Sequence, residues 1–143
     1  MITPFRIVAA AGVLLVTGLF TTLGHAQSAN WQVLREDPQI HAGLTVIAVG
    51  RHIQGICGDI RPRMVRAWTF AEGLVARAED LGVGRADVDA FIDNRAEQER
   101  YTAIMIEWFA ARGVDTGDEA AICRVGRDEI TAGTPIGRLL RSR

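Results

Sequence analysis

Lysine is absent from this chain of 143 residues, so all 16 of its basic side chains are arginines. Without a lysine amine, Schiff-base chemistry is excluded. The 17 acidic residues slightly outnumber the arginines, a balance that gives no general attraction to nucleic acid or to an anionic membrane surface. The arginines either form an anion-binding surface or reflect the codon usage of a GC-rich genome, and their scattered positions favour the second interpretation.

Serine and histidine are also scarce, which restricts the expected chemistry. The two serines, Ser28 and Ser142, lie near the ends of the sequence, where a nucleophile is rarely held rigidly against its base. Beyond the amino-terminal leader described below, the histidines are His41 and His52, about 16 Å apart along a helix and too distant to bind one ion. A Cys-x-x-Cys-His haem motif is also missing. The sequence therefore predicts no catalytic residue, no cofactor and no metal site.

The amino terminus has the pattern of a cleavable secretory signal. Arg6 supplies a positive charge, an apolar run follows from Ile7 to Gly24, and small residues at Gly24 and Ala26 match a signal-peptidase site. An uncleaved membrane anchor is the alternative, but the run is barely as long as the roughly 20 residues that span a bilayer. We predict a signal peptide over residues 1–26, cleaved after Ala26, and no stable membrane insertion afterwards. The expected location is the periplasm or the medium.

Two cysteines, Cys57 and Cys123, remain after the signal. An even number of cysteines in an oxidising compartment predicts a disulfide, and this one would close a long loop. In the chain-entropy model, such a bond stabilises a domain by about 4 kcal/mol. Two free thiols or a metal-binding pair are the alternatives.

Apolar residues at helical spacing predict an all-α domain over residues 37–143, preceded by a flexible amino-terminal arm over residues 27–36. Asp37 and Pro38 are typical of a helix start, and the helix that follows is apolar on more than one side, as expected at the centre of a bundle. We expect a small bundle of four to five helices closed by one disulfide. Its further helices are predicted near residues 62–81, 84–93, 95–112 and 119–132.

The helix near residues 62–81 carries the least ordinary surface feature. An apolar stripe runs along one face from Met64 to Ala78, and Arg66, Phe70 and Arg77 gather towards the other side. An aromatic residue flanked by arginines resembles the centre of a protein interface. The alternative is a phenylalanine at the edge of the core, covered by arginine stems. Arg66, Phe70 and Arg77 are therefore the candidate interaction surface.

Several motifs in combination resemble a family of small exported proteins of alphaproteobacteria that is known only as a domain of unknown function. The residues that carry the resemblance are Cys57, Pro62-Arg63-Met64, Cys123, Gly126-Arg127-Asp128-Glu129-Ile130 and Ile136-Gly137-Arg138-Leu139-Leu140. The resemblance covers roughly residues 40–140. It implies a helical exported domain with one disulfide, and it carries over no activity, ligand or catalytic residue.

These features favour an exported, non-enzymatic binding or interaction protein of the bacterial periplasm, and the expected partner is an unidentified periplasmic protein. Carboxylates supply the alternative, because two carboxyls that converge in a cleft act as general acid and base in glycoside hydrolysis. The candidates are Glu72, Glu107, Asp128 and Glu129. Nothing in their spacing brings two of them together, so a periplasmic hydrolase that uses paired carboxylates is the second hypothesis.

Overall fold

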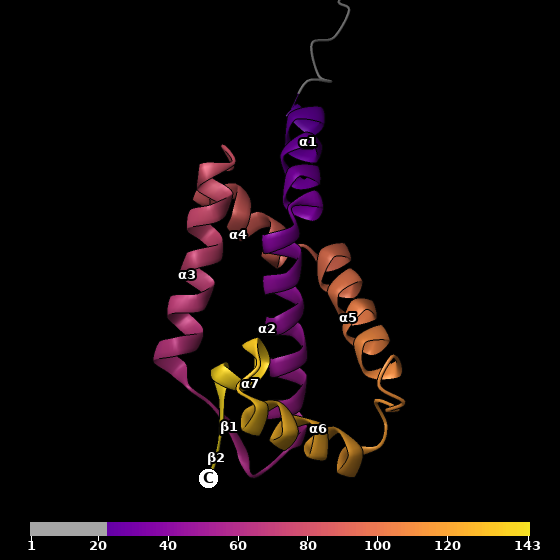
Figure 1. Cartoon of the computed structure of the whole chain (residues 1–143). Coiled ribbons are helices and arrows are strands. Elements are labelled where there is room, and N and C mark those ends of the chain that lie inside the picture. The colour runs from indigo at the N-terminus through magenta and orange to yellow at the C-terminus, as the bar shows by residue number, and fades with distance from the viewer. Residues whose placement is uncertain (1–22) are drawn as a thin grey trace, which may run out of the picture.

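Helix α2 (Pro38–Ile56) runs through the middle of the molecule, and the other helices surround it (Figure 1). The computed structural model describes residues 23–143. The Asp37 side chain caps α2 by accepting hydrogen bonds from the backbone N–H groups of Gln39 and Ile40, and Pro38 occupies the first turn. Because α2 contacts α1, α3, α5, α6 and α7, its apolar residues are covered on several sides, as the sequence predicts.

Seven helices and one pair of short strands make up the described residues. Strands β1 and β2 pair antiparallel, with Ile60 opposite Ser142 and Pro62 opposite Leu140. The remaining elements are α1 (Leu23–Glu36), β1 (Ile60–Pro62), α3 (Met64–Asp80), α4 (Arg85–Asp93), α5 (Arg95–Ala110), α6 (Glu119–Ala132), α7 (Pro135–Leu139) and β2 (Leu140–Ser142). The predicted all-α fold is confirmed, while α1 and α7 raise the number of helices above the expected four to five.

The predicted disulfide joins Cys57, just after α2, to Cys123 in α6. Their Cα atoms are 5.6 Å apart, and 66 positions separate the two residues in the sequence. Both sulfurs lie in a core cluster that also holds Ile53, Phe109 and Ile122, all of them buried. The bond therefore ties the central helix to the carboxyl-terminal part of the fold from inside the core.

A second core cluster lies towards the other end of α2. It contains the buried side chains of Leu34, Phe91 and Tyr101, which come from α1, α4 and α5. Helix α3 reaches this cluster through Val75 and Ala78 in its second half. The two clusters thus divide the core along α2, and α3 is anchored mainly at its carboxyl-terminal end.

The prediction of a flexible arm over residues 27–36 is wrong, because these residues belong to helix α1 in the structure. Leu34 is almost fully buried, and the Trp31 ring packs edge-on against Phe91 with 5.7 Å between ring centroids. Trp31 and Leu34 are three positions apart, so a helix places both on one face, against the second core cluster. The predicted signal peptide lies mostly in residues 1–22, outside the described residues, and its cleavage after Ala26 stays a prediction.

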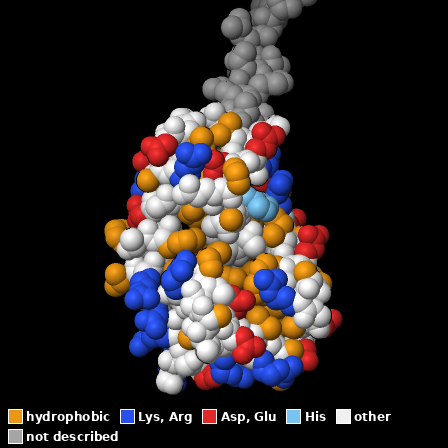
Figure 2. Space-filling model, in the orientation of Figure 1, with side chains coloured by type: hydrophobic (Ala, Val, Ile, Leu, Met, Phe, Trp, Pro, Cys, Tyr) orange, Lys and Arg blue, Asp and Glu red, His pale blue; other side chains and the backbone are white. Residues whose placement is uncertain are grey.

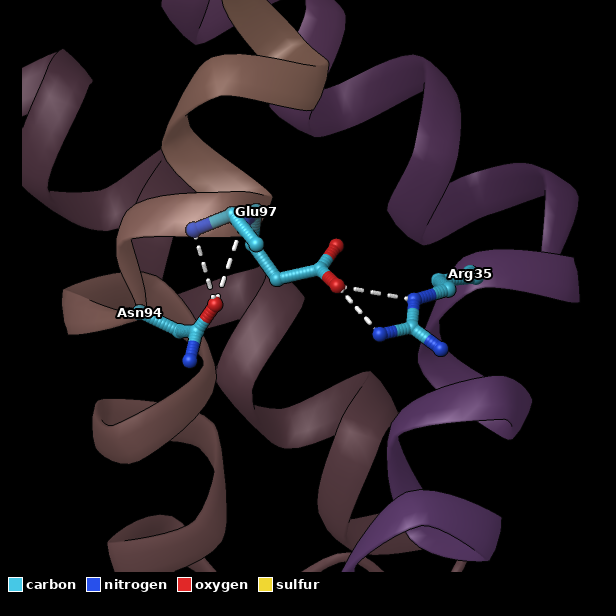
Figure 3. A network of polar contacts seen from close by, with 4 residues as sticks. Arg35, Asn94 and Glu97 are labelled. Atoms are coloured by element: carbon cyan, nitrogen blue, oxygen red, sulfur yellow. Dashed lines mark hydrogen bonds and ion pairs between the residues drawn. The ribbon is translucent and has the colours of Figure 1, made fainter.

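Two ion pairs fasten α1 and the start of α2 to the rest of the fold. The Arg35 guanidinium donates to one carboxylate oxygen of Glu97, at the start of α5, which is itself capped by Asn94 (Figure 3). Arg77, in the last turn of α3, donates to Asp37 with an N–O distance of 2.7 Å. Glu97 and Asp37 are the two buried charged side chains of the described residues, and each faces an arginine.

The Asp37–Arg77 pair predicts a specific loss of stability in acid. Hydrogen bonds from Arg77, and then from the backbone N–H of Ile40, lower the pKa of the Asp37 carboxyl in the folded state. Its contribution is therefore complete above the unfolded-state pKa of about 4, and it is lost as pH falls through the lower folded-state value. Asp37→Asn keeps a helix cap but cannot titrate, so its stability should fall less between pH 7 and pH ~3. Urea unfolding at both pH values tests this.

The exposed acid Asp93, which has no ion pair among the described residues, provides the control for this experiment. Asp93→Asn should follow the wild type at both pH values. Equal acid sensitivity of Asp37→Asn and the wild type would contradict the assignment.

Candidate functional site

The apolar stripe of α3 is buried in only half of its length. Val75 and Ala78 are buried, but Met64 and Trp68 on the same stripe are 69% and 67% exposed, and the neighbouring Val65 is 78% exposed. Large apolar side chains with this much exposure, side by side over the first turns of a helix, are typical of an interaction surface. We call Met64, Val65 and Trp68 the α3 apolar patch.

An apolar groove lies between the first half of α3, the middle of α2 and α7. Its volume is about 250 Å³, below the roughly 300–1,000 Å³ of most small-molecule pockets. Gly50 lines the groove, and a Cβ atom built at this position would meet no atom within 4 Å, so there is free space beside it. The groove is lined by Val46, Ile47, Gly50, Arg51, Gln54, Pro62, Met64, Ala67, Ala71, Leu139 and Leu140.

The segments that form the groove carry only positive charge. Residues 46–54, 60–71 and 133–143 contain seven arginines and no acidic residue. None of the seven forms an ion pair with an acid among the described residues, and Arg61 stands directly opposite Arg141 in the β1–β2 pair. Asp59, next to β1, is paired with Arg127 at 3.0 Å. The seven, which we call the rim arginines, are Arg51, Arg61, Arg63, Arg66, Arg138, Arg141 and Arg143.

The charge and the apolar patch meet on one side of the molecule. Figure 2 shows arginine side chains gathered low on the left of this face, where Figure 1 places the start of α3, and hydrophobic side chains stand out from the same edge. Two contacts fasten the carboxyl-terminal segment here: the Arg63 backbone N–H donates to the Leu139 carbonyl, and the Arg63 side chain donates to the Leu140 carbonyl at 2.8 Å. These contacts hold the carboxyl-terminal wall of the groove, at Leu139 and Leu140, against the start of α3.

The predicted interaction surface does not form one patch in the structure. Arg66 is exposed and belongs to the rim arginines, and Phe70 is half-buried one turn further along α3. Arg77 lies about 16 Å along the helix from Arg66, and its guanidinium is paired with Asp37. Sequence reasoning missed the α3 apolar patch because the spacing of Met64 and Trp68 is that of a core stripe. The arginines at 61, 63 and 66 were the available signal that this part of the stripe lies at a surface.

The candidate carboxylates occupy three different helices. Glu72 on α3 is paired with Arg85, whose hydrogen bonds lower the pKa of the Glu72 carboxyl. Glu107 on α5 and Asp128 on α6 are exposed, and Glu129 accepts a hydrogen bond from the Thr134 hydroxyl. Neither the groove nor a smaller apolar hollow of about 70 Å³ near α1, α3 and α4 is lined by an acidic side chain. The chemistry that the groove offers is apolar contact with a positive rim.

Both histidines of the described core pack against aromatic rings of α5. The His41 ring lies 6.0 Å from Tyr101, and the His52 ring lies 5.5 Å from Phe109, where burial lowers the pKa of the His52 imidazole. Within residues 23–143, no group of three or more His, Cys, Asp or Glu side chains is placed to hold a metal ion. In the same range, no helix is long and apolar enough to cross a bilayer.

Comparison with known proteins gives one match. The model of a family of unknown function, DUF5333, matches residues 32–141, from the last turn of α1 through α7 to the first two residues of β2. No curated protein and no solved structure matches the chain.

Proposed function

The chain belongs to DUF5333, a family of unknown function, and we propose that it is an exported, non-enzymatic interaction protein of the bacterial periplasm. The groove between α2, α3 and α7 is its docking site, and the α3 apolar patch is the centre of the contact. The observation that carries the proposal is the exposure of Met64, Val65 and Trp68 on a helix whose other half is packed normally.

A docking role fits the composition of this surface. Interfaces concentrate Trp, Met and Arg, and their energetic centres are aromatic or arginine side chains in apolar surroundings. Trp68 has apolar neighbours on its own helix and arginines on the adjoining turns and strand. A partner that covers Trp68 and fills the groove would continue the apolar layer that Val75 and Ala78 begin.

Export is supported by the disulfide and by the leader pattern. Structural disulfides persist in oxidising compartments and are rare in the bacterial cytoplasm, and the Cys57–Cys123 bond is buried in the core. The first residues of the sequence carry the positive, apolar and small-residue pattern of a signal peptide. An extracytoplasmic location accounts for both features together.

We expect the mature protein to begin at Gln27. Cleavage after Ala26 removes the apolar run and leaves Trp31, Leu34 and Arg35 of α1 in the exported chain, so the contacts of α1 with the second core cluster are retained. Intact-mass measurement and terminal sequencing of protein from the periplasm of its host test this. Full-length protein confined to the membrane fraction would show instead that the apolar run is an anchor.

Site-specific photo-cross-linking in the host tests the docking role. A photoreactive phenylalanine analogue at Val65, in the α3 apolar patch, should form a cross-linked product with another protein. The same analogue at Ile106, an exposed apolar residue on α5 with 45% exposure, is the matched control and should form none. Absence of a product at Val65, or equal products at both positions, would overturn the proposal.

The hydrolase hypothesis has no observation in its favour. None of its four candidate carboxylates lines the groove or the smaller apolar hollow, and Glu72 is paired with Arg85. A glycosidase pair requires two carboxyls about 5 to 10 Å apart in a cleft.

A further inference from the structure

We infer that the partner segment held by the groove is an acidic amphipathic stretch of another protein, with apolar side chains in the groove and carboxylates against the rim arginines. The inference rests on the proposed docking role and adds the chemistry of the partner. It is carried by the charge of the segments that form the groove, which hold seven arginines and no acidic residue although the chain as a whole is close to neutral.

Charge complementarity selects an acidic partner. The rim arginines have no acidic partner among the described residues, and several of them lie within one or two positions of a groove-lining residue. Arginine recognises carboxylates with paired, directional hydrogen bonds, and it does so better than a lysine could. A basic or neutral segment would leave the positive charge of the rim arginines uncompensated. An acidic segment would neutralise this charge, which raises both the association rate and the specificity of binding.

The same charges argue against a second copy of this chain as the occupant. A twofold dimer through the α3 apolar patch would bring the rim arginines of both copies together, because a symmetric interface uses the same surface twice. Like charges placed together across an interface oppose association. The repulsion between the two sets of rim arginines therefore opposes a dimer through the α3 apolar patch.

The shape of the surface argues for a protein segment over a lipid bilayer. The groove is recessed between α2, α3 and α7, and most of its lining residues lie on these walls. A bilayer surface would contact Met64, Val65 and Trp68 but would leave the recess unfilled. A helical segment that inserts one row of apolar side chains, as in helix-in-groove recognition, would fill the recess and also contact the α3 apolar patch.

Two synthetic peptides test the partner chemistry against the exported protein purified from its host. Each is about 18 residues long and helical, with the same leucine stripe, and the flanks are glutamate in one and arginine in the other. Fluorescence anisotropy should show the glutamate peptide binding at least ~10-fold more tightly at low ionic strength, with the difference shrinking as salt is added. Equal affinity, or tighter binding of the arginine peptide, would overturn the inference.

Matched variants separate the rim charge from overall charge. Arg51→Gln with Arg66→Gln removes two rim arginines, while Arg100→Gln with Arg124→Gln removes two exposed arginines elsewhere. The first double variant should weaken binding of the glutamate peptide about 5- to 10-fold, and the second should leave it unchanged. Equal losses in both would show that only net charge matters and would contradict a specific rim.

Other occupants give distinct results. Binding to vesicles of phosphatidylglycerol without binding to the glutamate peptide would identify a membrane, and a dimer in sedimentation that Trp68→Ala dissolves would identify a second copy; either result overturns the inference. If cross-links form at Val65 but neither peptide binds, the acidic partner is wrong and the docking role stands. If cross-links at Val65 are absent, the docking role itself fails.

Discussion

Replacing Cys57 and Cys123 together by alanine is expected to lower the free energy of unfolding by about 2–5 kcal/mol. The bond closes a loop of 66 positions, and its removal leaves two small gaps in a core where both sulfurs are buried. The helices should persist, because the apolar stripes that form them do not depend on sulfur. Circular dichroism at equilibrium in urea, on wild type and double variant, measures the difference.

Reduction of the wild-type protein provides the control for this prediction. Dithiothreitol should move the urea midpoint of the wild type towards that of the double variant, and it should leave the double variant unchanged. Coincident midpoints for the oxidised wild type and the double variant would mean that the bond contributes nothing to the native state.

Gly137→Ala is expected to be the most damaging single methyl addition to the fold, at about 3 kcal/mol or more. A Cβ atom at Gly137 would lie 1.8 Å from the backbone oxygen of Glu129 and 2.3 Å from its carbonyl carbon. Because the obstacle is backbone, α7 would have to move away from the end of α6, which would also uncover the buried Ile136 and Leu140. Urea unfolding followed by circular dichroism gives the change in stability.

Alanine substitutions at two further glycines, Gly126 and Gly55, provide comparisons for the stability loss expected at Gly137. At Gly126 a Cβ atom would meet the side chains of Ile53 and Ile60 at 2.6 and 2.7 Å, so Gly126→Ala should cost less, because side chains yield more easily than backbone. At Gly55, on α2, a Cβ atom would meet nothing within 4 Å, and Gly55→Ala should raise stability by up to about 1 kcal/mol. A smaller loss of stability for Gly137→Ala than for Gly126→Ala would contradict the close packing of α7 on α6.

The local features of the fold could be predicted because they depend on neighbouring residues. Asp37 and Pro38 begin α2 as their capping chemistry predicts, and Gly133 ends α6 in the left-handed backbone conformation that glycine favours. The disulfide follows from two cysteines together with the predicted export signal. The segment before Asp37 was misjudged because it has few apolar residues, and two of them, Trp31 and Leu34, suffice to dock a helix when an ion pair from Arg35 assists.

Features that depend on distant residues could not be predicted. Nothing local links Arg35 to Glu97 or Asp37 to Arg77, which are separated by 62 and 40 positions. The candidate surface at Arg66, Phe70 and Arg77 rests on the pattern of one helix, whereas Arg77 is paired with Asp37, which precedes α2. Whether Met64 and Trp68 are covered depends on the positions of α2 and α7, which are distant in the sequence. The spacing of apolar residues along a helix is the same whether the stripe is buried or exposed, so the spacing alone does not reveal the exposure.

The most direct measurement asks whether filling the groove prevents docking. Gly50→Leu places a side chain in the groove, while Gly55→Leu adds the same side chain to an exposed position of the same helix. Both replacements remove a glycine from α2 and should not destabilise it. With the photoreactive analogue at Val65, Gly55→Leu should retain the cross-linked product and Gly50→Leu should lose most of it. Equal yields in the two variants would contradict the groove as the docking site.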